Sequence, residues 1–180
     1  MKTVLFYAKK DNDICKIARE MLDFFFHVYE EDILEQYDYI ISFINGKILS
    51  KEVINKARIA SINFHTCPPK YPGTGGYSYA LYNGDNKFGV TCHHTDEYID
   101  HGKIIKVDWF RIAPNETINS LLEKAHKAAL KQFVYMITLM FLNKPFPKCS
   151  YEWRKKMDYK RNYMKIINKR LEKIKPEVFK

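Results

Sequence analysis

The sequence predicts an α/β protein with a mostly parallel sheet flanked by helices. Apolar runs rich in β-branched and aromatic residues alternate with helical patterns through residues 1–65, the order expected of parallel strands joined by crossover helices. The 180 residues, 46% of them hydrophobic and 28% charged, are enough for one domain with a buried core. Because no apolar run approaches the roughly 18 residues needed to span a bilayer, we expect neither a membrane segment nor a secretion signal.

The N-terminal third supplies the alternating elements. Residues 4–8 form an apolar run that predicts a strand, and residues 14–22 follow with a helical pattern. Residues 37–44 (YDYIISFI) predict a second strand, and residues 50–56 a short helix. Residues 57–65 (ARIASINFH) predict the third strand, which runs directly into a proline- and glycine-rich loop.

The remaining elements are two strands and three helices. Residues 77–82 predict a short helix ending at an Asn-Gly turn, and residues 88–94 and 103–112 predict strands. The longest helix should follow Pro114, with Asn115 as its N-cap. Its buried stripe is expected to contain Ile118, Leu121, Leu122, Ala125, Ala129, Phe133, Met136, Ile137 and Met140. A basic amphipathic helix, carrying Trp153, Met157, Ile167 and Leu171, should begin near Tyr151.

The positive charge is confined to the C-terminal tail. The formal net charge is +9; residues 1–143 contain 17 basic and 17 acidic side chains, and residues 144–180 contain 13 and 4. We therefore divide the chain into a main domain, residues 1–143, and a basic helical extension, residues 144–180. Three interpretations of the extension stay open: a solvated helix face, a site for a small polyanion such as a nucleotide diphosphate, or contact with RNA or an anionic membrane. No RNA-binding signature is recognisable, so we expect no nucleic-acid partner.

The cysteines and histidines do not predict a metal site. The four cysteines are scattered without a CxxC pair, which fits neither a disulfide framework nor structural zinc and is typical of a reducing cytoplasm. His93 and His94 are adjacent in a predicted strand, so they should face opposite sides and cannot both ligate one ion from that strand.

The residues most suggestive of chemistry lie between Asn63 and Gly102. Asn63 and His65 are two residues apart at the end of a predicted strand, so their side chains should point the same way. Ligands bind at the C-terminal ends of strands in open parallel sheets. The loop before Gly102 carries Asp96, Glu97 and Asp100, which by spacing alone could be solvated.

The stretch INFHTCPPKYPGTGGYSYALYNGDNKFGVTCHHTDEYIDHGKII closely resembles the core signature of the folate-dependent formyltransferases. The shared features are an Asn-x-His strand end, a proline loop, a short helix, an Asn-Gly turn, a Gly-Val-Thr strand, and an Asp followed two residues later by Gly. SFINGKILS (residues 42–50) is similar to the family's folate-pocket segment. The resemblance covers residues 37–142 and implies a Rossmann-like formyltransferase fold.

The resemblance implies that Asn63, His65 and Asp100 are catalytic. Formyl transfer from 10-formyltetrahydrofolate to an amine passes through a tetrahedral oxyanion, which needs preorganised donors and a route for the amine proton. Asn63 can supply an amide donor, and His65 can donate to the oxyanion or accept the proton. Asp100 can hold the protonation state of His65, and no metal is required. The folate is expected to contact Phe43, Ile44, Asn45, Lys47, Ile48, Leu49, Asp96 and Tyr98.

Departures from the family favour one of its branches. Enzymes acting on glycinamide ribonucleotide have a Gly/Ser-rich loop after the first strand, where this chain has KKDND. Those acting on methionyl-tRNA add a C-terminal β-barrel, whereas 38 residues with helical periodicity follow Leu142 here. The branch that formylates nucleotide-linked amino-dideoxysugars is similar in its PPxYPG loop and in a tail with Trp followed by basic and aromatic residues.

The resemblance therefore implies a cytoplasmic sugar N-formyltransferase, with a dTDP-linked 4-amino-4,6-dideoxyhexose as substrate and a place in lipopolysaccharide O-antigen biosynthesis. The alternatives are a formyltransferase that acts on another amine and a non-catalytic relative that binds nucleotides. A homodimer is possible, and the sequence does not decide the oligomeric state. Lys9 and Lys10 follow the first strand at the sheet edge where a pyrophosphate is expected. Further substrate contacts are expected from Tyr71, Gly73, Tyr77 and Trp153.

Overall fold

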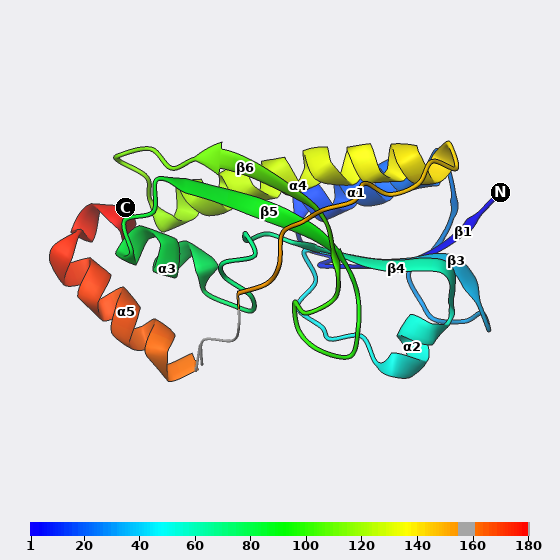
Figure 1. The fold of residues 1–180 in the computed structure, drawn as a ribbon, viewed down its shortest axis with the longest axis horizontal. Helices are drawn as coiled ribbons and strands as arrows, with labels where there is room; N and C mark the ends of the chain where they lie inside the picture. The colour runs from blue at the N-terminus through cyan, green and yellow to red at the C-terminus, as the bar shows by residue number, and fades with distance from the viewer. Residues whose placement is uncertain (155–160, 180) are drawn as a thin grey trace.

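A computed structural model describes residues 1–154 and 161–179, and it contains a single six-stranded sheet (Figure 1). The strands are β1 (Thr3–Ala8), β2 (His27–Tyr29), β3 (Tyr37–Phe43), β4 (Ala57–His65), β5 (Lys87–His94) and β6 (Ile104–Arg111). Their order across the sheet is β2-β1-β3-β4-β5-β6. The first four are parallel, whereas β5 runs antiparallel to β4 and β6 antiparallel to β5. The expected mostly parallel sheet is confirmed, and the strand β2 is an addition to it.

The main core lies between one face of the sheet and the helices α1 (Asp13–Asp23) and α4 (Ile118–Phe141), which run side by side in Figure 1. Seven members of the expected α4 stripe are buried: Leu121, Ala125, Ala129, Phe133, Met136, Ile137 and Met140. The short helix α2 (Lys51–Asn55) belongs to the opposite face, where Leu5, Tyr37, Ile40 and Leu49 form a smaller buried cluster. The sheet is thus covered unequally, as expected when one long helix supplies most of the apolar area on one face.

The start of α4 corrects one prediction. Its N-cap is Thr117 and not Asn115: the Thr117 hydroxyl accepts from the amide of Ser120 at 3.0 Å, and the Ser120 hydroxyl accepts from the amide of Thr117 at 3.0 Å. This reciprocal pair is a capping box, which satisfies two amides at the start of the helix. The buried carboxylate of Glu116 accepts from the amide of Ala113 at 3.1 Å and pairs with Lys124.

The tail differs from the expected helix beginning near Tyr151. Residues 151–154 form no helix, and α5 begins at Arg161 and ends at Ile174, followed by a 3₁₀ turn (Pro176–Phe179). Trp153 is therefore not on a helix, and Met157 lies outside the described residues. Ile167 and Leu171 are buried as predicted, and α5 packs against α3 (Gly76–Tyr82).

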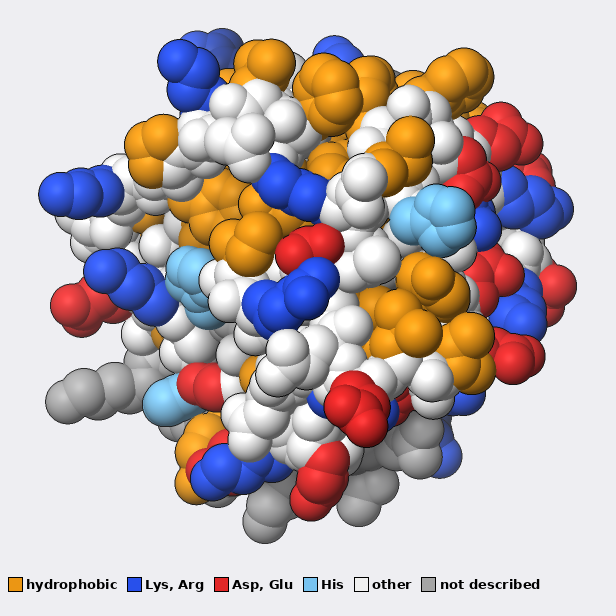
Figure 2. Space-filling model, turned by 90° about the vertical axis from the view of Figure 1, so that its right-hand side faces the viewer, with side chains coloured by type: hydrophobic (Ala, Val, Ile, Leu, Met, Phe, Trp, Pro, Cys, Tyr) orange, Lys and Arg blue, Asp and Glu red, His pale blue; other side chains and the backbone are white. Residues whose placement is uncertain are grey.

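Charge is mixed on the end of the molecule at which the N-terminus lies. Figure 2 shows this face with hydrophobic side chains in separate groups and basic and acidic side chains interspersed between them. In the described part of the chain, no helix is both long and apolar enough to cross a membrane.

Candidate active site

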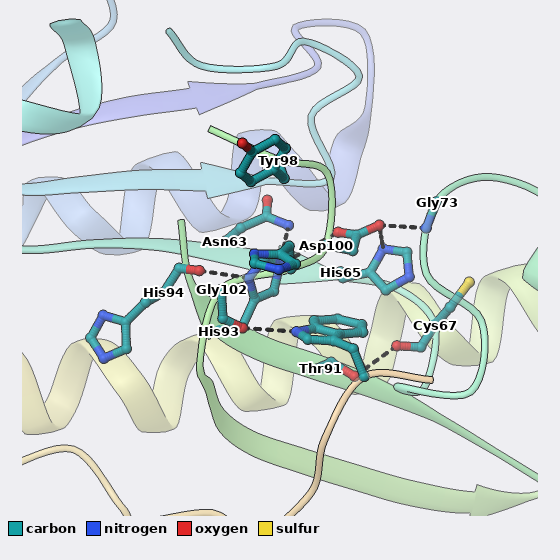
Figure 3. Close-up of polar contacts among 12 residues, drawn as sticks. Asn63, His65, Cys67, Gly73, Thr91, His93, His94, Tyr98, Asp100 and Gly102 are labelled. Carbon is teal, nitrogen blue, oxygen red and sulfur yellow. Dashed lines mark hydrogen bonds and ion pairs between the residues drawn. The ribbon is translucent and has the colours of Figure 1, made fainter. Parts of the chain in front are cut away.

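Two neighbouring strands present three polar side chains to one point. Asn63 and His65 lie on β4 and, being two residues apart, project from the same face. Asn63 is paired in register with His93 of the antiparallel strand β5. The amide Nδ2 of Asn63 lies 3.0 Å from His93 Nε2 (Figure 3). His94 points away from this group, so the expectation that His93 and His94 face opposite sides is confirmed.

Backbone carbonyls fix where each imidazole carries a proton. His93 Nδ1 lies 2.8 Å from the carbonyl of His94, and His65 Nε2 lies 2.9 Å from the carbonyl of Tyr71. A carbonyl only accepts, so both of these ring nitrogens must be donors. The second nitrogen of each ring, Nδ1 of His65 and Nε2 of His93, is thereby directed towards Asp100.

Asp100 lies between the two histidines. One carboxylate oxygen is 3.4 Å from His65 Nδ1, and the other is 3.4 Å from His93 Nε2. The backbone amide of Gly73 in the proline loop donates to Asp100 at 2.6 Å, so a loop residue holds the carboxylate in place. Asp100 adopts φ of 45°, a left-handed conformation that Asp tolerates better than most residues. The structure brings Asn63, His65 and Asp100 together, with His93 as the link between Asn63 and Asp100.

The environment of Asp100 favours its charged form. Burial by itself would raise the pKa of this carboxyl, but attraction to His65, the contacts with His93 and the Gly73 amide together hold the pKa below its ordinary value. An anion is thus retained within 3.4 Å of both imidazoles. Such an arrangement can store a proton and release it to a substrate atom.

A close backbone contact sets the loop that carries Asp100. A Cβ built on Gly102 would lie 1.8 Å from the carbonyl oxygen of His94, so only glycine fits there. The loop, residues 95–103, is also joined to β4 by the amide of Thr95, which donates to the carbonyl of Ser61 at 3.0 Å. These contacts bring the loop back across the strand ends so that Asp100 reaches His65.

The residues expected to bind folate fall into two adjoining loops. Phe43 and Leu49 are buried and support the segment, and Ile44 has φ of 47°. Asn45 and Lys47 bond to each other through side chain and backbone. Ile48 is 64% exposed. In the facing loop Tyr98 is 58% exposed, and its amide donates to Asp96. Lys51, the first residue of α2, pairs with Glu97 of the second loop at 3.6 Å, so the helix that follows the first loop lies beside the second loop.

The residues expected to bind substrate lie in several environments. Lys9 and Lys10 are exposed at the end of β1. Tyr71 is buried, and its hydroxyl donates to Asp85 at 2.6 Å. Its contribution to the site is its backbone carbonyl, which accepts the hydrogen bond from His65. Gly73 contributes its amide to Asp100, as above. Tyr77 donates to Thr66 at 2.6 Å, and burial raises the pKa of its hydroxyl.

A basic hollow of about 590 Å³ adjoins the proline loop. It is lined by Pro69, Lys70, Lys87, Trp109, Tyr151, Glu152 and Arg154. The ammonium group of Lys87 lies 4.7 Å from the Trp109 ring centre, and Lys70 pairs with Asp85 at 2.6 Å. Positive charge beside two aromatic rings suits a ligand that has both a phosphate and a planar ring.

His93 was not predicted to take part in this site. Adjacent histidines were weighed only as metal ligands, and the antiparallel pairing that sets His93 beside Asn63 is a long-range contact that residue spacing does not reveal. Within the described residues there is no group of three His, Cys, Asp or Glu side chains able to hold a metal ion.

The chain matches the family model described as formyl transferase over residues 27–137. This range begins at β2, ends within α4 and contains all three residues of the Asn-His-Asp group. The chain belongs to the formyl transferase family.

Curated relatives of this formyl transferase family member include methionyl-tRNA formyltransferases. That of Agathobacter rectalis is 41% identical over 88 residues, which are 48% of this chain and 28% of the relative. That of Mycoplasmopsis pulmonis is 26% identical over 115 residues, 63% of this chain and 40% of the relative. The chain thus spans less than half the length of these relatives.

Solved structures share the fold at low sequence identity. The formyltransferase PseJ from Anoxybacillus kamchatkensis, in complex with UDP-4,6-dideoxy-4-formamido-L-AltNAc and tetrahydrofolate, has a TM-score of 0.71 at 19% identity, covering 99% of this chain and 98% of the other. The N-formyltransferase from Helicobacter canadensis, in complex with folinic acid and dTDP-3-aminofucose, has a TM-score of 0.65 at 20% identity, covering 93% and 78%. At such identities the likeness establishes the fold.

Proposed function

We propose that this protein transfers a formyl group from 10-formyltetrahydrofolate to the amino group of a nucleotide-linked 4-amino-4,6-dideoxyhexose. The observation that carries the proposal is the convergence of Asn63, His65 and Asp100, with Asp100 held as an anion between two imidazoles. We further propose that the protein acts in the cytoplasm, where such a sugar would be modified for lipopolysaccharide O-antigen.

The reaction can be assigned to the side chains step by step. The substrate amine attacks the formyl carbon, and the carbonyl oxygen gains negative charge as a tetrahedral centre forms. The Asn63 amide has a second N–H besides the one that faces His93, and this N–H can donate to that oxygen; His65 can donate to it from Nε2 only by giving up its bond to the Tyr71 carbonyl. The amine must lose a proton, and the departing folate nitrogen must gain one when the bond from that nitrogen to the formyl carbon breaks. His65 and Asp100 provide a path by which a proton can be taken up and returned.

The two loops beside this group suit a folate. Ile48, Tyr98 and Ile99 are large side chains that remain more than half exposed there, which is typical of walls that cover a flat ring system on binding. Backbone groups of residues 43–49 and 95–100 can bind the pterin edge. These residues therefore fit the group that the proposal requires.

The sugar branch is supported by the match to PseJ. PseJ, whose complex contains a UDP-linked formamido sugar, is covered over 98% of its chain, so the tail of this protein has a counterpart there. Methionyl-tRNA as substrate is the second candidate, because a methionyl-tRNA formyltransferase is 41% identical over the 88 residues it shares with this chain.

Thermal-shift screening separates the two candidates. UDP- and dTDP-linked amino sugars, each with and without 5-formyltetrahydrofolate as a stable folate analogue, should raise the melting temperature, since a ligand that binds the folded state stabilises it. Stabilisation by methionyl-tRNA alone, with none by the nucleotide sugars, would reject the sugar substrate.

Two groups of basic side chains are candidates for binding the diphosphate. Lys9 and Lys10 lie at the end of β1, whereas Lys87 and Arg154 line the basic hollow beside the proline loop. We propose the hollow for the nucleotide, because Arg154 follows directly after a residue that touches both histidines. The Lys87→Ala/Arg154→Ala variant should raise the KM for the nucleotide sugar by about 10-fold or more, on the scale of two charge-assisted hydrogen bonds. A larger rise in this KM in the matched Lys9→Ala/Lys10→Ala variant would indicate that the diphosphate binds at the end of β1 instead.

A further inference from the structure

Trp153 connects the tail to both loops that build the site. Its indole Nε1 donates to the carbonyl of Gly102 at 2.8 Å, in the loop that carries Asp100. The next residue, Arg154, donates its backbone amide to the carbonyl of Pro69 at 3.0 Å, in the proline loop. The segment 151–154 is therefore bonded to two separate walls of the site.

The indole ring also contacts both imidazoles. Its ring centre lies 5.0 Å from that of His93 at an interplanar angle of 87°, and 5.8 Å from that of His65 at 62°. These are edge-to-face geometries, which orient rings as well as bury them. Trp153 is thus in contact with both of the rings that flank Asp100.

Such a contact matters because neither ring has a short hydrogen bond to Asp100. His65 has one short hydrogen bond, from Nε2 to the Tyr71 carbonyl, so its ring can still rotate about that bond. His93 has two, with the His94 carbonyl and with Asn63, and neither of them is to Asp100. The nitrogen of each ring that faces Asp100 is 3.4 Å from it, longer than a good hydrogen bond. A bulky side chain packed against both rings restricts their movement away from Asp100.

We propose that Trp153 is a positioning residue, which holds His65 and His93 towards Asp100 and closes this side of the site. The inference rests on the proposed formyl transfer for its effect on rate, but its geometric content can be tested without turnover. It differs from the substrate contact expected of Trp153 from the sequence: a residue that stacks on the nucleotide base acts on substrate affinity, whereas a positioning residue acts on kcat.

Steady-state kinetics distinguish these roles. For Trp153→Ala we expect kcat to fall by about 10- to 100-fold, the scale of a small misplacement of catalytic groups, with the KM for the nucleotide sugar within about 3-fold. Trp153→Phe keeps a ring against the histidines and loses only the bond to Gly102, so it should recover most of the lost kcat. Phe24→Ala, which removes an aromatic side chain that is 81% exposed, is the matched control and should leave kcat unchanged. A large rise in KM with unchanged kcat in both Trp153 variants would overturn the proposal in favour of base stacking.

Fluorescence tests the contact itself. The chain has two tryptophans, so Trp109→Phe leaves Trp153 as the sole emitter. The indole packs edge-to-face against both imidazoles, so His65→Asn/His93→Asn in the same background should change the intensity and wavelength of Trp153 emission.

The outcomes separate the two hypotheses. If Trp153 emission changes when the histidines are replaced and the unaltered protein formylates no nucleotide sugar, the proposed function fails and the contact stands. If Trp153 emission is insensitive to the histidines, the positioning role fails even when turnover is normal. Circular dichroism of each variant checks that it folds, and Trp153→Phe keeps the proposal testable if Trp153→Ala does not.

Discussion

Replacing Asp100 with Asn removes one negative charge and leaves the shape of the side chain almost unchanged. The Gly73 amide still needs an acceptor, so the Asn side-chain oxygen should take the place of the carboxylate oxygen that lies 2.6 Å from that amide. The same carboxylate oxygen faces His65. The amide nitrogen then faces His93 Nε2, which lies 3.4 Å from the second carboxylate oxygen in the unaltered protein. Both imidazoles therefore lose the neighbouring negative charge.

The expected effect is on turnover. General acid–base catalysis typically contributes a factor of about 10² to 10⁴, so kcat for Asp100→Asn should fall by that factor, corresponding to roughly 3–5 kcal/mol of transition-state stabilisation. Affinity for the nucleotide sugar should stay within a few-fold, because the diphosphate is expected to bind away from Asp100. Folate affinity can change more, since the same loop is expected to touch the pterin.

Steady-state kinetics beside isothermal titration decide this prediction. Near-normal turnover in Asp100→Asn would remove Asp100 from the mechanism. Loss of all ligand binding would show that the main role of Asp100 is to hold the loop structure through its contact with Gly73. The Asp96→Asn variant is a suitable control, because Asp96 lies in the same loop and pairs with the exposed His101.

Three further predictions concern stability. Glu116→Ala should lower the free energy of unfolding, measured by urea titration, by about 1–3 kcal/mol, because the Ala113 amide and Lys124 lose a buried acceptor. An unchanged urea midpoint would show that the carboxylate does not contribute to stability. Asp100 and Glu116 both have lowered pKa values, so they stabilise the fold above the pKa of the unfolded chain, about 4, and this stability is lost as the pH falls through their folded values. Melting temperatures measured against pH should fall on that acid side, less steeply in Asp100→Asn, and a parallel fall would contradict the assignment. Gly102→Ala should destabilise the protein and reduce turnover, because its Cβ would collide with the His94 carbonyl; normal melting and kinetics would show that the loop can shift without consequence.

The elements set by local pattern were predictable from the sequence. The period-2 and period-3.6 patterns identified five of the six strands, and the seven buried residues of α4 followed from the same spacing. The strand β2 was missed because three residues at a sheet edge are too short to show alternation. Asn115 was preferred as N-cap because it directly follows Pro114, but Thr117 and Ser120 form a reciprocal pair that depends on the exact start of the helix.

The site was predictable where residues are close in the sequence or share a family motif. Asn63 and His65 lie on one strand, and Asp100 followed from the resemblance. The parts that depend on long-range pairing were not predictable: His93 meets Asn63 across an antiparallel pair, and Trp153 crosses 51 residues to reach the carbonyl of Gly102. The helical spacing of the tail also concealed that residues 151–154 form no helix.

The most direct test of the central claim is the product of the reaction itself. The protein is incubated with 10-formyltetrahydrofolate and a panel of UDP- and dTDP-linked amino sugars, and the products are examined by mass spectrometry. We predict that one nucleotide sugar gains a single formyl group with release of an equal amount of tetrahydrofolate, and that Asp100→Asn slows this conversion by the factor given above. Formylation of methionyl-tRNA with none of the nucleotide sugars, or no formyl transfer to any amine tested, would contradict it.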